Sequence, residues 1–217
     1  MNASNFTCLI TAGPTREYVD PVRFFSNASS GKMGYALASA AVERGWSVDL
    51  VSGPVCLAPP SGVSFHPVVT AAEMESACRQ LFPACDLLVM CAAVADYRPV
   101  SPAKRKIKKK DESLVIHLEP TVDIAKALAT EKRHQLCVGF AAETDHIEAH
   151  ARKKLREKNL DWIVANDVSS PEIGMEADQN RVTLFSVTGE SRSFGPAPKS
   201  DVADFILGAI MGAAPRG

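Results

Sequence analysis

Residues 8–34 read CLITAGPTREYVDPVRFFSNASSGKMG, and this stretch decides how the chain begins to fold. A short apolar run ends at Thr11-Ala12-Gly13, a polar loop follows, and residues 29–34 (SSGKMG) open a strongly helical segment. The order is therefore a strand, a long loop and a helix N-terminus. Unpaired backbone N–H groups at a helix start, with the positive end of the helix dipole behind them, favour a phosphate or a carboxylate. We expect an anionic ligand at this loop.

The rest of the chain alternates between apolar runs and helix-like segments. The runs cover residues 6–12, 47–52, 63–68, 86–93, 135–142 and 161–165, and the expected helices cover 32–44, 71–82, 123–132, 146–158 and 199–211. Such alternation favours βαβ units and a parallel sheet, and nearly continuous apolar strands are typical of sheets that carry helices on both faces. We predict an α/β fold with a Rossmann-like, doubly wound, mostly parallel sheet, formed by residues 1–217 as a single domain.

Two segments break this alternation and look like β-hairpins. Residues 104–119 read as two short strands joined at 110–112, and residues 181–187 with 192–194 read as a second pair. We expect both hairpins to be excursions from the sheet.

The composition excludes several classes of protein. A net charge of −1 argues against general nucleic-acid binding, and no apolar run is long enough to span a bilayer. No basic segment precedes the first apolar run, so we expect no signal peptide and a cytoplasmic location. The six cysteines form no C-x-x-C pair, which predicts neither structural zinc nor disulfides.

Familiar nucleotide motifs fit residues 26–34 poorly. Ser26 stands where a Walker loop has its first glycine, and Met33 replaces the magnesium-binding hydroxyl. A dehydrogenase is disfavoured because the second strand ends in Val51-Ser52-Gly53, with neither a carboxylate for a ribose nor an arginine for a 2′-phosphate. The pattern Gly31-x-x-Gly34 has a second explanation, namely close packing of the helix against a strand.

Basic residues gather in two further places. Six of the seven residues from Lys104 to Lys110 are basic, and such a run is either a solvated or nucleic-acid-binding segment or a flap over a bound phosphate. Lys154 and Lys158 share one face of a predicted helix, which is either solvated or turned to a ligand. His146 and His150 have the same spacing, but no third metal ligand accompanies them, and we expect surface histidines.

The chain resembles the phosphopantothenate–cysteine ligases, also called phosphopantothenoylcysteine synthetases. The resemblance runs from residue 10 to about residue 207 and rests on ITAGPTRE, DPVRFFSNASSGKMG, LVSGPV, CAAVADYRP, KIKK, VGFAAET, KNLDWIVANDV and the D-x-N at 178–180. It implies CTP as co-substrate with Mg²⁺, activation of 4′-phosphopantothenate as an acyl-cytidylate, and amide formation with L-cysteine. In many bacteria this domain follows a flavin-dependent decarboxylase, so the chain looks like the synthetase alone, and docking of a separate decarboxylase is left open.

The resemblance also assigns roles to individual residues. Asn27 would contact the acyl-cytidylate. Lys106 would bind the nucleotide and act in the second half-reaction, where it would stabilise the leaving phosphate. The phosphopantothenate cradle would comprise Arg23, Ser30, Gly31 and Lys32. The nucleotide would be bound by Gly13, Ala92, Ala93, Asp96, Thr121, Val122, Asp123, Ile124, Phe140, Lys154 and Lys158. The family commonly has Pro-Asp-Ile where this chain has Val122-Asp123-Ile124, and often an aromatic residue where it has Met175. Metal ligands are not assigned.

A homodimer is implied as well, with the lysine hairpin and residues 181–194 as the expected contacts. Two alternatives from other classes stay open at this point: an NAD(P)-dependent oxidoreductase on the same fold, and a nucleotide-binding module without turnover.

Overall fold

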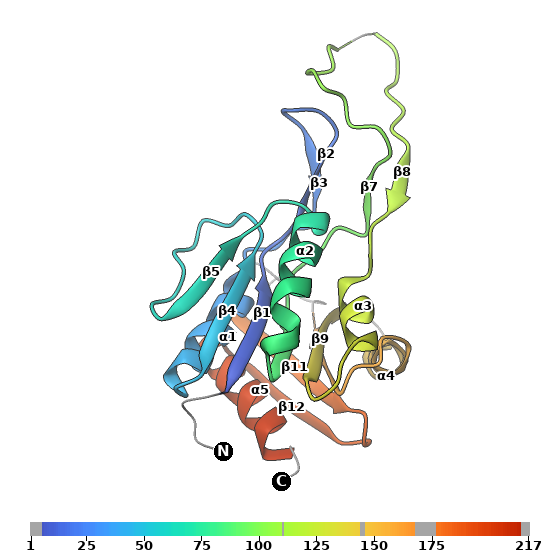
Figure 1. The fold of residues 1–217 in the computed structure, drawn as a ribbon. Coiled ribbons are helices and arrows are strands. Elements are labelled where there is room, and N and C mark those ends of the chain that lie inside the picture. The colour runs from blue at the N-terminus through green and yellow to red at the C-terminus, as the bar shows by residue number, and fades with distance from the viewer. Residues whose placement is uncertain (1–5, 110, 144–145, 168–176, 214–217) are drawn as a thin grey trace.

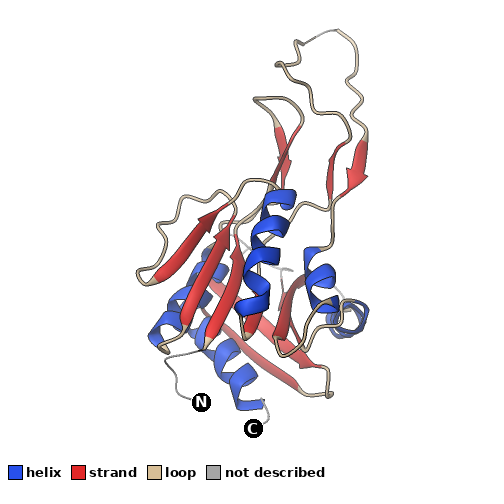
Figure 2. Cartoon of the chain, viewed as in Figure 1, coloured by secondary structure: helices blue, strands red, loops and turns tan. Residues whose placement is uncertain are grey.

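An eight-stranded sheet forms the centre of the molecule. The computed structural model describes residues 6–109, 111–143, 146–167 and 177–213. The strands of the sheet are β1 (Thr7–Ala12), β4 (Ser47–Ser52), β5 (Val63–Pro67), β6 (Leu87–Met90), β9 (Leu136–Glu143), β10 (Trp162–Asp167), β11 (Gln179–Ser186) and β12 (Ser191–Pro198). Their order across the sheet is β12-β11-β10-β9-β6-β1-β4-β5. Figures 1 and 2 show the sheet with its helices.

Six of these strands, β5-β4-β1-β6-β9-β10, run parallel and follow the Rossmann order. The chain moves outward from β1 through β4 to β5, then returns to the other side of β1 with β6. This reversal beside β1 is the topological switch at which open α/β sheets bind ligands. The predicted doubly wound, Rossmann-like fold is confirmed.

Helices cover both faces of the sheet. Helices α1 (Lys32–Glu43) and α5 (Lys199–Ala213) pack on one face, and α2 (Ala71–Leu81), α3 (Ile124–Thr130) and α4 (Ile147–Glu157) pack on the other. A short 3₁₀ turn, η2 (Phe82–Ala84), follows α2. Along β1, Cys8 and Ile10 belong to the first core and Leu9 to the second. Because alternate side chains of a strand point to opposite faces, burial on both faces requires the continuous apolar runs of the sequence.

The expected excursion at residues 181–194 is wrong. These residues form β11 and β12, which extend the main sheet with two antiparallel strands. Val182 and Leu184 are buried in the same core as α5. The apolar side chains of this hairpin find cover only if the hairpin joins the sheet, and α5 provides that cover.

Two arms rise away from the sheet beyond one end of its strands (Figure 1). One is the hairpin of β2 (Arg16–Tyr18) and β3 (Phe24–Ser26), and the other pairs β7 (Tyr97–Pro99) with β8 (Leu118–Pro120). The hairpin expected within residues 104–119 is therefore only partly right, because its first strand lies upstream of the lysine run. Among the described residues, no helix is both long and apolar enough to cross a membrane.

Candidate functional site

A cavity of about 540 Å³ lies at the carboxyl ends of the central strands. Its wall is built from the loop before α1, the loop after β6, the start of α3, the end of β9 and one face of α4. Most residues assigned by resemblance line it: Asn27, Gly31, Lys32, Ala92, Ala93, Asp96, Thr121, Val122, Asp123, Ile124, Phe140, Lys154 and Lys158. The parallel strands bring these residues together, because all their carboxyl ends meet at one edge of the sheet.

The start of α1 is open to the cavity. Gly31 precedes the helix in the left-handed conformation, with φ of 77°, and as a glycine it brings no side chain to cap the first turn. Its own N–H donates to the hydroxyl oxygen of Ser29 at 3.4 Å. A Cβ atom at Gly31 would lie 2.8 Å from Cγ1 of Val55, so both the backbone angle and the space require glycine. Backbone N–H groups at such a helix start, with the helix dipole behind them, suit an anion.

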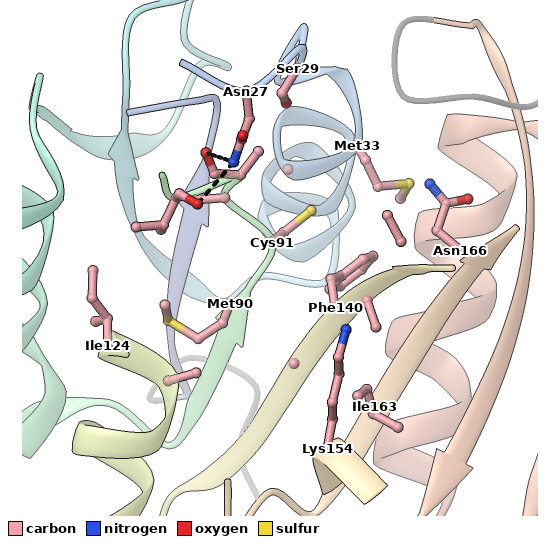
Figure 3. A pocket seen from close by; sticks show the side chains of 18 of the residues that line it. Asn27, Ser29, Met33, Met90, Cys91, Ile124, Phe140, Lys154, Ile163 and Asn166 are labelled. Carbon is pink, nitrogen blue, oxygen red and sulfur yellow. Dashed lines mark hydrogen bonds between the residues drawn. The ribbon is translucent and has the colours of Figure 1, made fainter. Parts of the chain in front are cut away.

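Asn27 ties the loop before α1 to the loop after β6. Its side-chain amide nitrogen donates to the carbonyl oxygens of Ala93 at 3.3 Å and Val94 at 2.9 Å (Figure 3). Donation by this amide to a ligand would therefore require these bonds to be exchanged. The role of Asn27 in the reaction stays a prediction.

The second group of cavity residues comes from α4 and the start of α3. The ammonium of Lys158 lies 3.0 Å from a carboxylate oxygen of Asp123, and Asp123 also caps α3 by accepting from the N–H of Lys126. Lys154 extends toward Phe140 (Figure 3). Both lysines line the cavity, so of the two explanations for their spacing the ligand-facing one fits the structure better.

Lys199 and Asn180 also line the cavity, and the sequence did not single them out as site residues. Lys199 is only 6% exposed and donates to the carbonyl of Ala177. Burial lowers the pKa of Lys199, the Lys32 ammonium lowers it further, and the Asp178 carboxylate opposes both effects. A signal was available, because a lysine in the first turn of a helix stands at the unfavourable end of the helix dipole. Asn180 was noted only within the D-x-N motif.

Lys32 pairs with Asp178 at the same end of the cavity. The ammonium nitrogen of Lys32 lies 2.6 Å from Oδ1 of Asp178, and this hydrogen bond, followed by the charge of Lys32, lowers the pKa of the Asp178 carboxyl. Two lysines and one carboxylate thus gather near the start of α1. The cluster carries a net positive charge, which suits an anionic ligand.

Four assigned residues lie outside the lining of the cavity: Gly13, Arg23, Ser30 and Lys106. Gly13 lies beneath the cradle, where its carbonyl accepts from the N–H of Ala93 at 2.9 Å. Arg23 turns to the protein, because its guanidinium donates to Asp20 and to the carbonyl of Ile107. Lys106 is exposed on the long loop between β7 and β8. The structure does not bring Arg23 into a cradle with Lys32.

Three further observations bear on the chemistry of the cavity. Burial raises the pKa of the Cys91 thiol to about 12, so this cysteine is not a thiolate nucleophile at neutral pH. A buried acceptor, Oδ1 of Asn166, has no hydrogen-bond partner in the described part of the chain. The described residues also contain no group of three histidine, cysteine, aspartate or glutamate side chains able to hold a metal ion.

Comparison with known proteins now identifies the family. Residues 4–213 match the family model described as the DNA/pantothenate metabolism flavoprotein C-terminal domain. The chain belongs to this family. It is 52% identical over 200 residues to the coenzyme A biosynthesis bifunctional protein CoaBC of Bacillus subtilis, covering 92% of this chain and 49% of that protein.

Two more comparisons agree with this family. The CoaBC protein of Escherichia coli K12 is 49% identical over 186 residues, which cover 84% of this chain and 46% of that protein. The chain thus spans about half the length of the curated relatives it matches. The crystal structure of a CoaBC C-terminal domain superimposes with a TM-score of 0.82 at 46% identity, covering 97% of this chain and 96% of that one.

Proposed function

We propose that this chain is a CTP-dependent phosphopantothenate–cysteine ligase of coenzyme A biosynthesis, acting in the cytoplasm. The observation that carries the proposal is 52% identity over almost the whole chain to a coenzyme A biosynthesis protein. The cavity supports it, because residues assigned to substrate and nucleotide, among them Asn27, Asp96 and Phe140, converge on one space.

The proposed reaction has two steps, each with its own leaving group. A carboxylate oxygen of 4′-phosphopantothenate attacks the α-phosphorus of CTP, and pyrophosphate leaves. The amine of L-cysteine then attacks the activated carbonyl carbon, loses a proton and displaces CMP. The protein contributes mainly position and charge, because such transfers depend on aligned groups and on neutralised phosphate charge.

The cavity offers a group for each of these tasks. Lys154 and Lys158 supply cations from α4, and the N–H groups of the first turn of α1 supply donors. Phe140 can border the base, and Asp96 can accept from ribose hydroxyls or the cytosine amine. Oδ1 of Asn166 is one more acceptor available to a ligand N–H group.

The residues of the cavity fit Mg²⁺ carried by the triphosphate. Magnesium in such sites is held by phosphate oxygens and one or two carboxylates. Asp96 and Asp123 are carboxylates of the lining, and Asp123 is already paired with Lys158. The ion would neutralise charge on the phosphate oxygens.

A homodimer is part of the proposal. Large apolar side chains are exposed on the arms and the loop between β7 and β8, where they would need a partner surface: Val22, Phe24, Phe25, Tyr97, Val100, Leu114, Val115 and Leu118. Exposed apolar groups gathered in this way are typical of an interface. Residues 181–194 belong to the main sheet, so we now place the contact on the arms. Sedimentation at several protein concentrations tests this assignment.

The relatives are named bifunctional, so we also propose association with a phosphopantothenoylcysteine decarboxylase. Co-purification with such a decarboxylase expressed alongside the chain would test this part.

The central experiment follows pyrophosphate with CTP, ATP, UTP and GTP side by side. We expect release from CTP when phosphopantothenate and Mg²⁺ are present, and amide product only after L-cysteine is added. Asn27→Ala should slow formation of the acyl-cytidylate and leave the fold intact. Absence of pyrophosphate with every nucleotide would refute the ligase. A change of nicotinamide fluorescence on mixing would favour an oxidoreductase instead, and bound but intact nucleotide would favour a binding module.

A further inference from the structure

Asp20 lies in the turn between β2 and β3, and its two carboxylate oxygens serve different parts of the chain. The residue is 1% exposed. Oδ1 accepts from the backbone N–H groups of Val22 at 2.8 Å and Arg23 at 2.9 Å, which closes the turn. Oδ2 accepts from the guanidinium of Arg23 and from the backbone N–H of Ile107, both at 3.1 Å. The second oxygen therefore reaches the lysine run of the other arm.

Ile107 is held through both of its backbone polar groups. Its N–H donates to Asp20, and its carbonyl accepts from the Arg23 guanidinium at 3.1 Å. A further bond, from the N–H of Ala103 to the carbonyl of Val19 at 2.8 Å, holds the other end of the same segment. These contacts bracket residues 104–106.

The lysine run has little reason to keep this shape by itself. Five of the six residues from 104 to 109 are basic, and like charges in sequence repel one another and favour an extended, mobile chain. The buried carboxylate of Asp20 supplies the opposite charge at the middle of this run. One of its oxygens accepts a hydrogen bond from the N–H of Ile107 and another from the guanidinium of Arg23. Hydrogen bonds to a charged group are about twice as strong as bonds between neutral groups.

We propose that Asp20 is a positioning residue of the ligase: with Arg23 it fixes the backbone of Ile107 and thereby the direction from which Lys106 projects. The inference rests on the proposed function, in which Lys106 serves the second half-reaction. Arg23 accordingly acts by holding the lysine segment and not by cradling a substrate phosphate.

The charge state of Asp20 is consistent with this role. Burial alone would raise the pKa of Asp20, but the N–H groups of Val22, Ile107 and Arg23, and then the Arg23 guanidinium, hold it below the ordinary aspartate value. The carboxylate is therefore ionised at neutral pH.

The test variant is Asp20→Asn, because an asparagine carbonyl can replace Oδ1 and keep the turn, while its amide puts a donor where Oδ2 accepted. The matched control is Asp204→Asn, which removes a carboxylate that accepts from Arg44 at 2.6 Å, between α1 and α5. Limited digestion with trypsin measures how firmly residues 104–109 are held, and it does not depend on the ligase activity. We expect cleavage within residues 104–109 to become about tenfold faster in Asp20→Asn, as loss of a charge-assisted contact opens the segment. The control should cleave at the wild-type rate.

The activity readout separates positioning from general damage. Asp20→Asn should slow amide formation about tenfold or more, with pyrophosphate release within about twofold of wild type. Combined with Lys106→Ala, it should add no further loss, because both changes remove the same contribution. Multiplied losses in the double variant, or equal slowing of both half-reactions, would overturn the positioning role.

Hydrogen exchange and trypsin digestion test the inference even if Asp20→Asn does not fold or the wild type shows no ligase activity. If Asp20→Asn does not fold, hydrogen exchange in the wild type decides, since the amide of Ile107 should exchange more slowly than those of Lys108 and Lys109. Equal exchange at the three amides, or unchanged trypsin cleavage in the variant, would refute the anchoring. If the wild type releases no pyrophosphate from CTP, the proposed function fails, while digestion and exchange still decide whether Asp20 anchors the segment.

Discussion

Gly34 offers the sharpest test of how closely α1 packs on the central strand. A Cβ atom at Gly34 would lie 2.5 Å from Cβ of Ala12, 3.1 Å from its Cα and 3.3 Å from the carbonyl oxygen of Thr11. Two of these three contacts are to backbone atoms, which cannot rotate away. We therefore expect Gly34→Ala to push the start of α1 off β1. This contact also supports the packing explanation of Gly31-x-x-Gly34 for its second glycine.

The size of the effect follows from these distances. Carbon atoms pack at about 3.5–4.0 Å, so the helix must retreat by about 1 Å or more. Overpacking of this kind costs about 1–3 kcal/mol, and replacing glycine by alanine inside a helix returns about 0.5–1 kcal/mol. With an overpacking cost in the middle of that range, about 2 kcal/mol, the net loss should be about 1–1.5 kcal/mol, or a fall in Tm of roughly 2–6 °C for a chain of this length. Because the cavity is lined by Asn27, Gly31 and Lys32 at this helix start, a displacement of about 1 Å should reduce ligation about 100-fold.

The control for this prediction is the same substitution in α5. Gly208 is exposed, and a Cβ atom there meets nothing within 4 Å. Gly208→Ala should therefore stabilise the protein by about 0.5–1 kcal/mol and leave ligation unchanged. Urea unfolding gives the stabilities, and the pyrophosphate assay gives the rates. Equal stability of Gly34→Ala and Gly208→Ala would refute the reasoning, as would full activity of Gly34→Ala.

Three further predictions concern charge and ionisation. Lys158→Met should raise the KM for CTP about tenfold with less than about 1 kcal/mol change in stability, because its ion pair with Asp123 is half exposed. The control Lys153→Met, at a position outside the cavity lining, should change neither the KM nor the stability. An unchanged KM in Lys158→Met would contradict the assignment of Lys158 to the nucleotide. In the native protein at pH 8, a thiol reagent should titrate the exposed Cys56 rapidly and the four buried cysteines (Cys8, Cys78, Cys85 and Cys137) only after unfolding, since burial raises the pKa of each of these four. Rapid reaction of three or more thiols would count against the packed core. The folded pKa of Asp20 lies below the ordinary value of 3.8, so its contribution to stability is complete above about pH 4 and is lost as the pH falls through the folded pKa. Urea unfolding between pH 5 and pH 2.5 should therefore show that the stability of Asp20→Asn falls less steeply with decreasing pH than that of the wild type. Equal slopes for the two proteins would contradict this prediction.

Local patterns predicted most of the secondary structure. The strand expected at 47–52 is β4 (Ser47–Ser52), and the helix expected at 32–44 is α1 (Lys32–Glu43). The accuracy has a physical source, because a strand buried on both faces needs an unbroken apolar run and a helix needs its own period of apolar positions. Asn27, Asp96 and Phe140 were assigned by the family resemblance, and the structure brings them to one cavity because the carboxyl ends of parallel strands meet at one edge of the sheet.

Long-range contacts decided what local patterns could not. The hairpin at 181–194 looked separable by sequence, yet it joins the sheet because its apolar side chains are covered by α5. Lys199 opens that same helix, and packing of α5 buries it beside the cavity; its place in the first turn was the one signal that the sequence carried. Arg23 turns to Asp20 and Ile107 for a similar reason, since its partner Ile107 is 84 positions away along the chain.

The sequence by itself determined the βαβ alternation, the open helix start at Gly31 and the family, because these depend on residue order and on backbone geometry within a few residues. Only the tertiary structure decided that Gly34 touches Ala12, that Lys199 enters the cavity and that the lysine run is held by Asp20. Those features depend on which distant segments share a surface, and sharing a surface is a property of the packed chain and not of any stretch within it.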